Sequence, residues 1–310
     1  MCLILKNVIA WNPFRFHANA PTTEKEDTMT EATTRTHAYH AEAVDIHGKL
    51  HLPLTQNVAP QAHTKLIEEG GYLSQHVRDF KLEGVLSFRH AYAQVSGMPG
   101  KKPGHGPATL STSVIEGLNI LEILTCDRII AQISTEHPLD GFVPEISLLG
   151  TRFENLRING HHVNVELDPY IFGDKPANDA PYTKQPAFVK KVTDQHHHIR
   201  QHSEAPAEAK GHFSLTPTGF DTLEEVEFSL VNKAHGTYPG VSYGHIIHVP
   251  HFGTVTLAKV HLKHEDPCPK TGSPQCTTIC LKMLELKLGC MIDGNITLGN
   301  SVTNGTGQGH

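Results

Sequence analysis

The chain has 310 residues, of which 38% are hydrophobic and 19% charged, and it contains 26 glycines and 20 prolines. This composition argues against a disordered tail and against a membrane protein, and it is typical of a globular β-rich protein with many turns. The formal net charge is −6, from 26 basic and 32 acidic residues, and no basic stripe interleaved with aromatic residues is present. Nucleic acid is therefore not an expected partner, and no apolar run long enough for a transmembrane segment occurs.

Histidine is the unusual residue, with 24 copies. Protonating all of them would move the formal charge from −6 to +18, since −6 + 24 = +18. Because imidazole titrates near pH 6.5, we expect the net charge to change sign near pH 6. Biased surface usage, metal binding and pH sensing are all open explanations for this composition.

Residues 1–37 precede the first regular pattern and are interpreted as a leader or disordered segment. The apolar run after Met1 is interrupted by Lys6, Pro13 and Arg15, so it lacks the unbroken apolar stretch of a signal peptide. A polar, acidic stretch follows, and Met29 opens a cleaner sequence. Either methionine is compatible with the true start.

The clearest strand pattern covers residues 44–54, where apolar residues alternate with polar ones. Such alternation with one polar face is typical of an antiparallel sheet. Residues 80–88 repeat the pattern as one further strand, and residues 64–69 are compatible with a short helix. Residues 109–135 are long enough for a helix but rich in β-branched side chains, so we predict two or three strands bent at residues 125–127.

A β-hairpin is predicted around Asn159-Gly160, with strands at residues 156–158 and 163–167, because Asn-Gly tolerates the positive φ angles of a type I′ turn. Residues 173–222 contain five prolines and a run of three histidines. They are interpreted as a polar insertion or long loop, in which only residues 187–202 could form a short helix.

Later strands are predicted at residues 225–232, 242–249, 254–264 and 277–291. Residues 293–310 are rich in Gly, Asn and Thr and are predicted to be a flexible tail. The short strands and frequent turns predict one all-β domain over residues 38–292. It is mainly antiparallel and built as a β-sandwich or a barrel.

Several short segments, taken in order, carry a resemblance to a known family: Ala38-Tyr39, Gly48–Pro53, Gly117–Leu121, Thr125–Ala131, Phe153–Gly160, Gly253–Leu257 and Leu284–Gly289. Over residues 38–292 the chain resembles the choice-of-anchor P family of bacterial β-rich proteins. The resemblance implies an exported, surface-associated or secreted protein without an established activity. The chain departs from that family in lacking a convincing signal peptide and in its insertion at residues 173–222, so a cytoplasmic location stays open.

Six cysteines are present, and Cys268 and Cys276 bracket a Pro/Gly loop between two predicted antiparallel strands. A disulfide between these two is sterically reasonable in an oxidising compartment. Cys126, Cys280 and Cys290 are interpreted as small buried residues. No C-x-x-C pair occurs, which argues against a zinc ribbon.

His245, His248 and His251 form the densest local histidine set apart from the run at residues 196–198. On a strand, His245 and His248 point to opposite faces, so a shared metal ion needs a bend or a ligand from another strand, such as His261. His245, His248 and His261 are therefore candidate ligands for a transition metal such as zinc, copper or nickel. Solvated or hydrogen-bonded imidazoles are the alternative.

Familiar enzyme motifs fail on inspection, since the sequence has no G-x-S-x-G elbow, no H-E-x-x-H and no complete phosphate loop. No catalytic or cofactor-binding residue is predicted. We expect a non-catalytic structural, adhesion or assembly domain whose loops, chiefly residues 173–222, contact a protein or a surface glycan. The alternatives are a metal- or pH-responsive histidine-rich binding protein and a hydrolase with a loop-borne active site, and the oligomeric state stays open.

Overall fold

The computed structural model describes residues 36–53, 55–82, 84–202, 225–266, 275–289 and 292–308. These residues belong to one compact unit, Thr34–His310. Nearly all of the predicted leader at residues 1–37 and residues 203–222 of the predicted insertion lie outside the described part.

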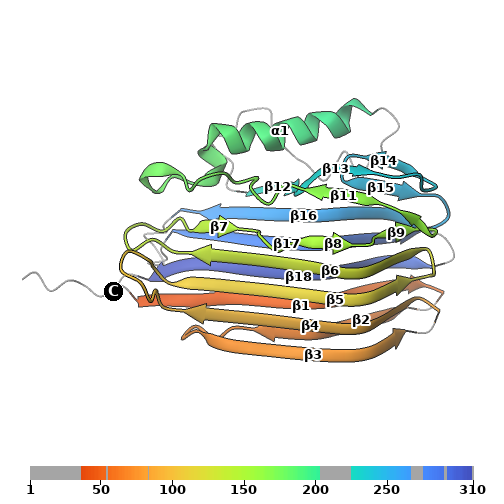
Figure 1. The fold of residues 1–310 in the computed structure, drawn as a ribbon, viewed down its shortest axis with the longest axis horizontal. Helices are drawn as coiled ribbons and strands as arrows, with labels where there is room; N and C mark the ends of the chain where they lie inside the picture. Colours follow the sequence, from red (N-terminus) through yellow and green to blue (C-terminus); the bar gives the residue numbers. More distant parts are fainter. Residues whose placement is uncertain are drawn as a thin grey trace, which may run out of the picture. The chain divides into compact units, whose positions relative to one another are not determined.

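Two large antiparallel sheets form the fold, as the alternating pattern predicted (Figure 1). The first sheet, sheet A, has the order β14-β15-β16-β17-β18-β1-β2, with β12 also paired to β16. Its strands are β1 (Thr36–Leu52), β2 (Gln56–Lys65), β12 (Glu225–Ser229), β14 (Val241–Tyr243), β15 (Ile246–Val249), β16 (Gly253–Glu265), β17 (Cys276–Gly289) and β18 (Asp293–Gln308).

The second sheet, sheet B, has the order β10-β9-β6-β5-β4-β3, with β7 and β8 also paired to β6. Its strands are β3 (Gly71–Leu82), β4 (Leu86–Met98), β5 (Ala108–Ile120), β6 (Leu124–Glu136), β7 (Glu145–Ser147), β8 (Arg152–Glu154), β9 (Arg157–Ile158) and β10 (His161–His162). A small third sheet pairs β11 (Asn164–Leu167) with β13 (Val231–His235). Sheets A and B pack face to face over a shared apolar core and stay separate in the described residues, so the fold is sandwich-like and not a closed barrel.

Three local predictions in the first half of the chain need correction. Residues 80–88 are not one strand but the β3–β4 hairpin, in which Phe80 pairs with Phe88 and Leu82 with Leu86. The short helix at residues 64–69 was wrong, because β2 runs to Lys65 and a turn leads into β3. Residues 109–135 do form two strands, but the turn lies at residues 121–123 and not at 125–127.

The Asn159-Gly160 turn is confirmed, with positive φ angles of 49° and 78°. Its second strand is shorter than predicted, since across the turn β9 pairs with the two-residue β10, while β11 pairs with β13 in the separate small sheet. The hairpin therefore redirects the chain from sheet B toward the third sheet.

The predicted flexible tail at residues 293–310 was wrong. Residues 293–308 form β18, which pairs with β1 on one side and β17 on the other along almost its whole length. Its inward side chains are Ile296, Leu298, Ser301 and Thr303, all of which are buried. The end of the chain therefore fills the middle of sheet A and joins β1 to the strands that precede it.

Along each strand of the two large sheets, every second side chain faces inward. In each sheet this alternation shifts by one residue at a single row that crosses neighbouring strands. In sheet B the row is Asp79, Arg89, Gly117 and Asp127, and in sheet A it is Asp45, Gly299, Met283 and Ala258. We call these the bulge rows. Every second strand has a positive φ there: 51° at Asp79, 67° at Gly117, 62° at Gly299 and 45° at Ala258. Because all strands change together, the register continues on both sides of the row.

The bulge rows divide the core into two halves with different side chains. On one side, the aliphatic half contains large residues, among them Leu50, Leu86, Phe88, Leu118, Ile120, Leu124, Leu286, Ile296 and Leu298. On the other, the small-residue half places many short side chains on the central strands, beside large ones such as Ile115, Ile129 and Ile133. The short ones are Ala41, Ala43, Ala91, Ala93, Ser111, Ser113, Ala131, Ser301 and Thr303.

Serines of the small-residue half form hydrogen bonds between the two sheets. Ser111 Oγ in β5 donates to the carbonyl of Glu42 in β1 at 2.8 Å, and Ser301 Oγ in β18 donates to the carbonyl of Ala131 in β6 at 3.2 Å. A serine side chain is short, so these bonds require the two backbones to lie much closer than the roughly 10 Å usual for stacked sheets.

Helix α1 (Pro186–Gln201) confirms the helix predicted inside the insertion and lies along the β12 edge of the sandwich (Figure 1). Pro186 occupies the first turn, where a missing N–H costs nothing. Phe188, Val192, His196 and Ile199 form its buried stripe. No helix in the described ranges has the length and apolar character needed to cross a membrane.

An aromatic cluster attaches the start of α1 to the sandwich. The ring of Phe188 stacks on Phe172 at 5.3 Å between centroids and meets Phe228 of β12 edge-on at 5.2 Å. Tyr182, in the 3-10 turn before the helix, contacts Phe172 at 5.1 Å and donates a hydrogen bond from its hydroxyl to the carbonyl of Pro144. The described part of the insertion is therefore a packed cover over one edge of the sandwich.

Candidate functional site

A cavity of about 400 Å³ lies beneath α1 and is our candidate site. Its wall comes from four separate parts of the chain: the turn after β11, helix α1, strand β13 and the turn between β14 and β15. The lining residues are Asp168, Ile171, Lys191, Asp194, Gln195, His198, Ile199, Val231, Asn232, Gly244 and His245. We call this cavity the α1 pocket.

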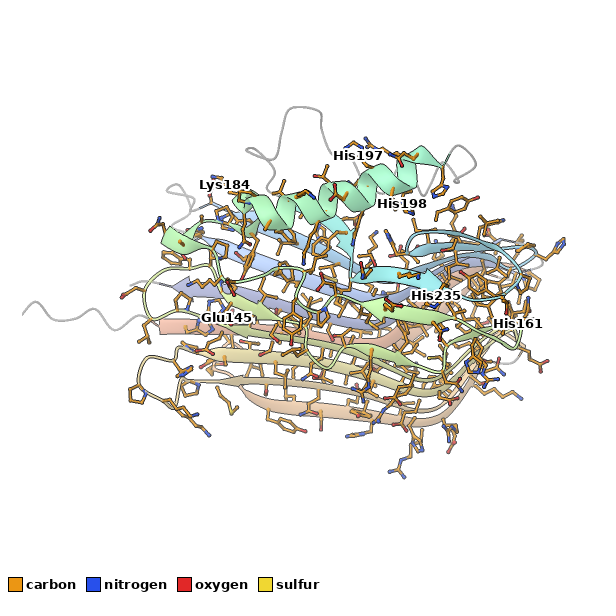
Figure 2. The ribbon with its side chains drawn as sticks, turned by 45° about the horizontal axis from the view of Figure 1, so that its top comes forward. Glu145, His161, Lys184, His197, His198 and His235 are labelled. Atoms are coloured by element: carbon orange, nitrogen blue, oxygen red, sulfur yellow. The ribbon has the colours of Figure 1, made fainter. Side chains whose placement is uncertain are left out.

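Helical spacing explains how α1 supplies most of the polar lining. Lys191, Asp194, Gln195 and His198 follow one another at intervals of three, one and three residues, which places them on one side of the helix. This side borders the buried stripe and faces the β13–β15 region. Figure 2 shows the contrast between adjacent residues, with His198 on the side toward the sheets and His197 on the side away from them.

Gln195 holds helix α1 against β12 through two hydrogen bonds. Its amide Nε2 donates to the carbonyl of Ser229 at 2.8 Å, and its Oε1 accepts from the Ser229 N–H at 3.1 Å. Ser229 Oγ in turn donates to the carbonyl of Leu257 and accepts from the N–H of Val231. The chain of bonds ties α1 to β12, β13 and β16 at the base of the α1 pocket.

Charged side chains on the rim are arranged in two ion pairs. Lys191 Nζ lies 2.8 Å from Asp168 Oδ2 and also donates to the carbonyl of Tyr170 at 3.5 Å. Lys190 Nζ lies 3.1 Å from Asp194 Oδ2, where both groups are largely exposed and contribute little to stability. Two carboxylates and two ammonium groups therefore balance each other around the pocket.

Two histidines lie below or within this region and are buried. The His196 ring donates from Nε2 to the carbonyl of Glu227 at 3.0 Å, and burial lowers its pKa to about 4. His196 is therefore neutral at the pH where most imidazoles begin to charge. His245 is 2% exposed, and its own carbonyl accepts a hydrogen bond from the Leu257 N–H.

Comparison with known proteins places the chain in a family without an assigned activity. A family model described as a domain of unknown function, DUF8256, matches residues 37–263. The chain belongs to the DUF8256 family. No curated protein and no solved structure shows significant similarity to it. The resemblance to the choice-of-anchor P family stays an untested expectation.

The matched range has a structural consequence for this DUF8256 chain. It ends inside β16, before β17 and β18. Those two strands lie between β16 and β1 in sheet A. In this chain the sandwich therefore includes two central strands that lie beyond the matched residues.

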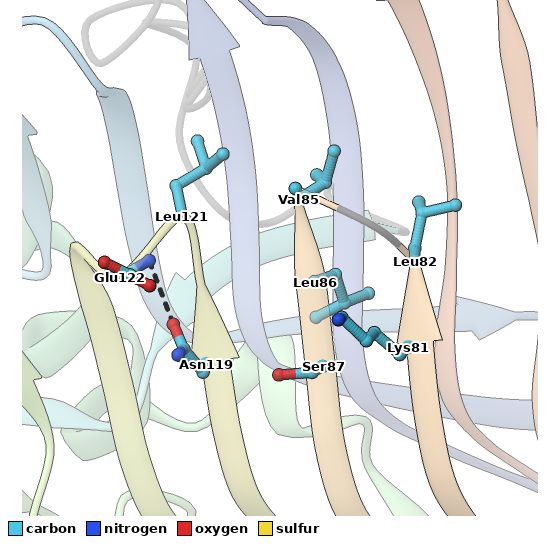
Figure 3. Close-up of a pocket in the computed structure, with 9 residues that line it drawn as sticks. Lys81, Leu82, Val85, Leu86, Ser87, Asn119, Leu121 and Glu122 are labelled. Atoms are coloured by element: carbon cyan, nitrogen blue, oxygen red, sulfur yellow. Dashed lines mark hydrogen bonds between the residues drawn. The ribbon is translucent and has the colours of Figure 1, made fainter.

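Two further pockets of the DUF8256 domain are smaller, at about 290 Å³ each. One lies between the β3–β4 and β5–β6 turns, where Glu122 donates its N–H to Asn119 Oδ1 at 2.9 Å (Figure 3). The other lies on the outer face of sheet B beside the bulge row, where Tyr92 stacks on His76 at 5.6 Å. In both, neighbouring strands of a single sheet form most of the wall, whereas the α1 pocket gathers polar groups from separate segments.

The structure separates the three histidines predicted to bind a metal. His248 is exposed and pairs with Thr254, which lies seven residues along β16 from His261, or about 23 Å at strand spacing. His261 instead contacts the Glu225 carboxylate, and only His245 reaches the α1 pocket. Across the described ranges, no group of three or more His, Cys, Asp or Glu side chains is placed to hold a metal ion. The metal hypothesis thus gains no support from the geometry.

The predicted disulfide cannot be followed, because Cys268 lies outside the described residues, as does Cys290. The Cys268–Cys276 pairing stays a prediction. Cys126 is buried as predicted, and its Sγ donates to the carbonyl of Glu154, while burial raises its pKa to about 12. Cys280 is half-buried and not buried as predicted, but desolvation raises the pKa of its thiol to about 11, so neither thiol is a ready nucleophile at neutral pH.

Sequence reasoning missed Asp168, Lys191, Asp194 and Asn232 as site residues. One signal was present, because the polar residues of 191–198 recur at helical spacing next to a buried stripe. That signal marks a polar helix side but not what it faces. The opposing residues come from β13 and the β14–β15 turn, and only the fold brings them together.

Proposed function

We propose that this DUF8256 chain is a non-catalytic binding domain of a structural, adhesive or assembly system. In this role the sandwich is a rigid support, and the described part of the insertion, residues 173–202, is the recognition surface. The partner is a protein or a surface glycan, and the resemblance to choice-of-anchor P proteins favours a location at the cell surface.

The observation that carries this proposal is the attachment of α1. A long polar insertion with no packing would be expected to move freely, whereas this one is held by an aromatic cluster and by the two hydrogen bonds between Gln195 and Ser229. Holding a recognition element rigidly reduces the entropy lost on binding. The outward side of α1, where His197 is exposed, is then available to a partner (Figure 2).

The chemistry of the buried groups supports binding in preference to bond making. Burial keeps the Cys126 and Cys280 thiols protonated and His196 neutral, so these groups are held as packing and hydrogen-bonding elements. Paired charges on the rim of α1 suit recognition of polar surfaces.

The test is a binding screen of the full chain against arrays of immobilised glycans and extracellular matrix proteins. The test variant combines Lys184→Ala and His197→Ala on the outward side of the α1 segment (Figure 2). The matched control carries Arg78→Ala and Lys81→Ala on β3, away from the helix. We expect saturable binding that the α1 variant loses and the control keeps.

Three results would overturn the proposal. They are no saturable binding to any array, binding that the α1 variant retains in full, or turnover of chromogenic ester, phosphate or glycoside substrates by the purified chain. Circular dichroism and the Tm of each variant confirm that the fold is intact.

A further inference from the structure

We infer that the α1 pocket binds a neutral, polyhydroxylated small molecule of the pyranose sugar type. This site lies on the inner side of α1, whereas the recognition surface proposed above lies on its outer side. Either role can therefore fail without the other.

The size of the pocket fits a small ligand. Its volume of about 400 Å³ lies in the range of small-molecule sites, and it is the largest of the three pockets described above. Its walls come from helix, strand and turn, so a ligand inside it would be contacted from several directions.

The polar lining matches hydroxyl groups in particular. Asp168 and Asp194 supply carboxylate acceptors, Lys191 supplies a donor, and Asn232 supplies both a donor and an acceptor. A sugar hydroxyl donates and accepts at once, so it can satisfy both kinds of group. A mixed set of this kind on neighbouring walls is difficult to satisfy with a ligand that only accepts or only donates.

Charge excludes two other ligand classes. The Asp168–Lys191 pair is neutral at 2.8 Å and Asp194 is paired with Lys190 at 3.1 Å, so these groups offer an anion such as sulfate acceptors as well as donors and no excess positive charge. A metal cation needs a converging set of ligands, and no group of three His, Cys, Asp or Glu side chains among the described residues provides one. A neutral ligand remains as the best match.

Apolar walls complete the match. Ile171, Ile199 and Val231 reach the pocket between the polar groups. A pyranose ring presents C–H groups on its faces and hydroxyls around its edge, so aliphatic side chains can contact the faces while the rim groups bind the edge. The Gln195–Ser229 bonds hold the helix side of the pocket in place before the ligand arrives.

The experiment uses the full chain and saturation-transfer NMR with the methyl glycosides of glucose, galactose and mannose and with N-acetylglucosamine. Titration of any sugar that gives a signal then yields its Kd. Asn232→Ala and Asp194→Ala each remove one polar group from the wall, and we expect each to weaken binding by about tenfold, the equivalent of losing one hydrogen bond to a fixed group. Arg78→Ala, on β3 and away from the helix, is the matched control and should leave the Kd unchanged.

The inference is overturned if no sugar gives a saturable signal, or if both pocket variants bind as tightly as the unmodified chain. It is also overturned if sulfate or zinc alone binds and the pocket variants abolish that binding. Equal Tm values for the variants and the unmodified chain show that a loss of binding is local. An array result from the proposed function leaves these outcomes unaffected, since its variants lie on the other side of α1.

Discussion

The aliphatic half and the small-residue half of the sandwich fill the space between the two sheets in different ways. In the aliphatic half, large side chains such as Leu118 and Leu298 fill the space between the sheets. In the small-residue half, Ala and Ser on the central strands let the sheets approach until serine hydroxyls bond to the opposite backbone. The bulge rows separate the two regions, so a change of spacing coincides with a change of side-chain parity.

This difference shows that the inter-sheet spacing is set by side-chain size and then fixed by hydrogen bonds. A core held by dispersion and burial tolerates small adjustments, but hydrogen bonds from serine hydroxyls of one sheet to backbone carbonyls of the other do not. The two halves should therefore respond differently to changes in side-chain volume.

The largest effect is expected for Leu118→Ala in the aliphatic half. Leu118 is 2% exposed, and shortening it leaves a cavity between sheets whose spacing the neighbouring large residues maintain. The expected loss is about 2–5 kcal/mol in the free energy of unfolding, measured by urea denaturation. Leu139→Ala, at an exposed leucine, should change the stability by less than about 0.5 kcal/mol. A small loss of unfolding free energy in Leu118→Ala would mean that the two sheets move together to fill the cavity, so that the large residues do not fix their spacing.

Ala131→Leu tests the small-residue half in the other direction. Ala131 is fully buried, and its carbonyl accepts the bond from Ser301 of the facing sheet. A leucine there must push the sheets apart and break that bond, so we expect a loss of about 1–3 kcal/mol. The control Gln94→Leu places the same side chain on the outer face of β4 and should cost little. If Ala131→Leu were neutral, the two halves would not differ in the way the serine bonds indicate.

Gly299→Ala tests the bulge row of sheet A. The φ of Gly299 is 62°, and an added Cβ would lie 3.1 Å from Met283 Cβ and 3.4 Å from Ile129 Cγ2. The left-handed backbone costs a residue with a Cβ about 1–2 kcal/mol. Gly289→Ala on β17 is the matched control, because nothing lies within 4 Å of its added Cβ. Equal stability of the two variants in urea denaturation would contradict a strained row at Gly299.

The two halves also explain which parts of the fold the sequence could reveal. Large alternating residues mark the aliphatic half, so most strands and the all-β class were predictable from period two. The strand formed by residues 293–308 was not predicted. Its Ser301 and Thr303 face inward in the small-residue half, where short polar side chains replace the apolar ones that hydropathy detects. Residues 80–88 were misread since Phe80, Leu82, Leu86 and Phe88 keep the same parity through the turn of a hairpin.

The candidate site was less predictable than the fold. Helix α1 followed from its local pattern, but the α1 pocket joins Asp168, Asn232 and His245, which are far apart in the chain. Neither the bulge rows nor the pairing of Gln195 with Ser229 leaves a local sequence signal, because each depends on which strands become neighbours. Motif reasoning therefore identified histidines that the fold separates and passed over the residues that it brings together.

Asp45 is where the two halves meet, and its ionisation gives the smallest and most specific prediction. It lies on the bulge row of sheet A, is fully buried, and accepts a hydrogen bond from Ser113 Oγ of the facing sheet. Burial raises the pKa of this carboxyl well above its usual value of 3.8, so it stays protonated in the folded chain at pH values where the unfolded chain ionises. The unfolded state then binds fewer protons than the folded state, and stability falls as the pH rises above about 3.8.

Asp45→Asn keeps an acceptor for Ser113 and removes the titration. We expect its Tm to match that of the unmodified chain near pH 3.5 and to exceed it by about 3 °C or more at pH 8, since 1 kcal/mol corresponds to roughly 2–4 °C in a chain of this size. The exposed Asp140→Asn is the control and should show no such divergence. A difference in Tm that stays constant, or that shrinks with rising pH, would mean that Asp45 is ionised between the sheets. A buried carboxylate beside Ser113 would then require a compensating partner within the small-residue half.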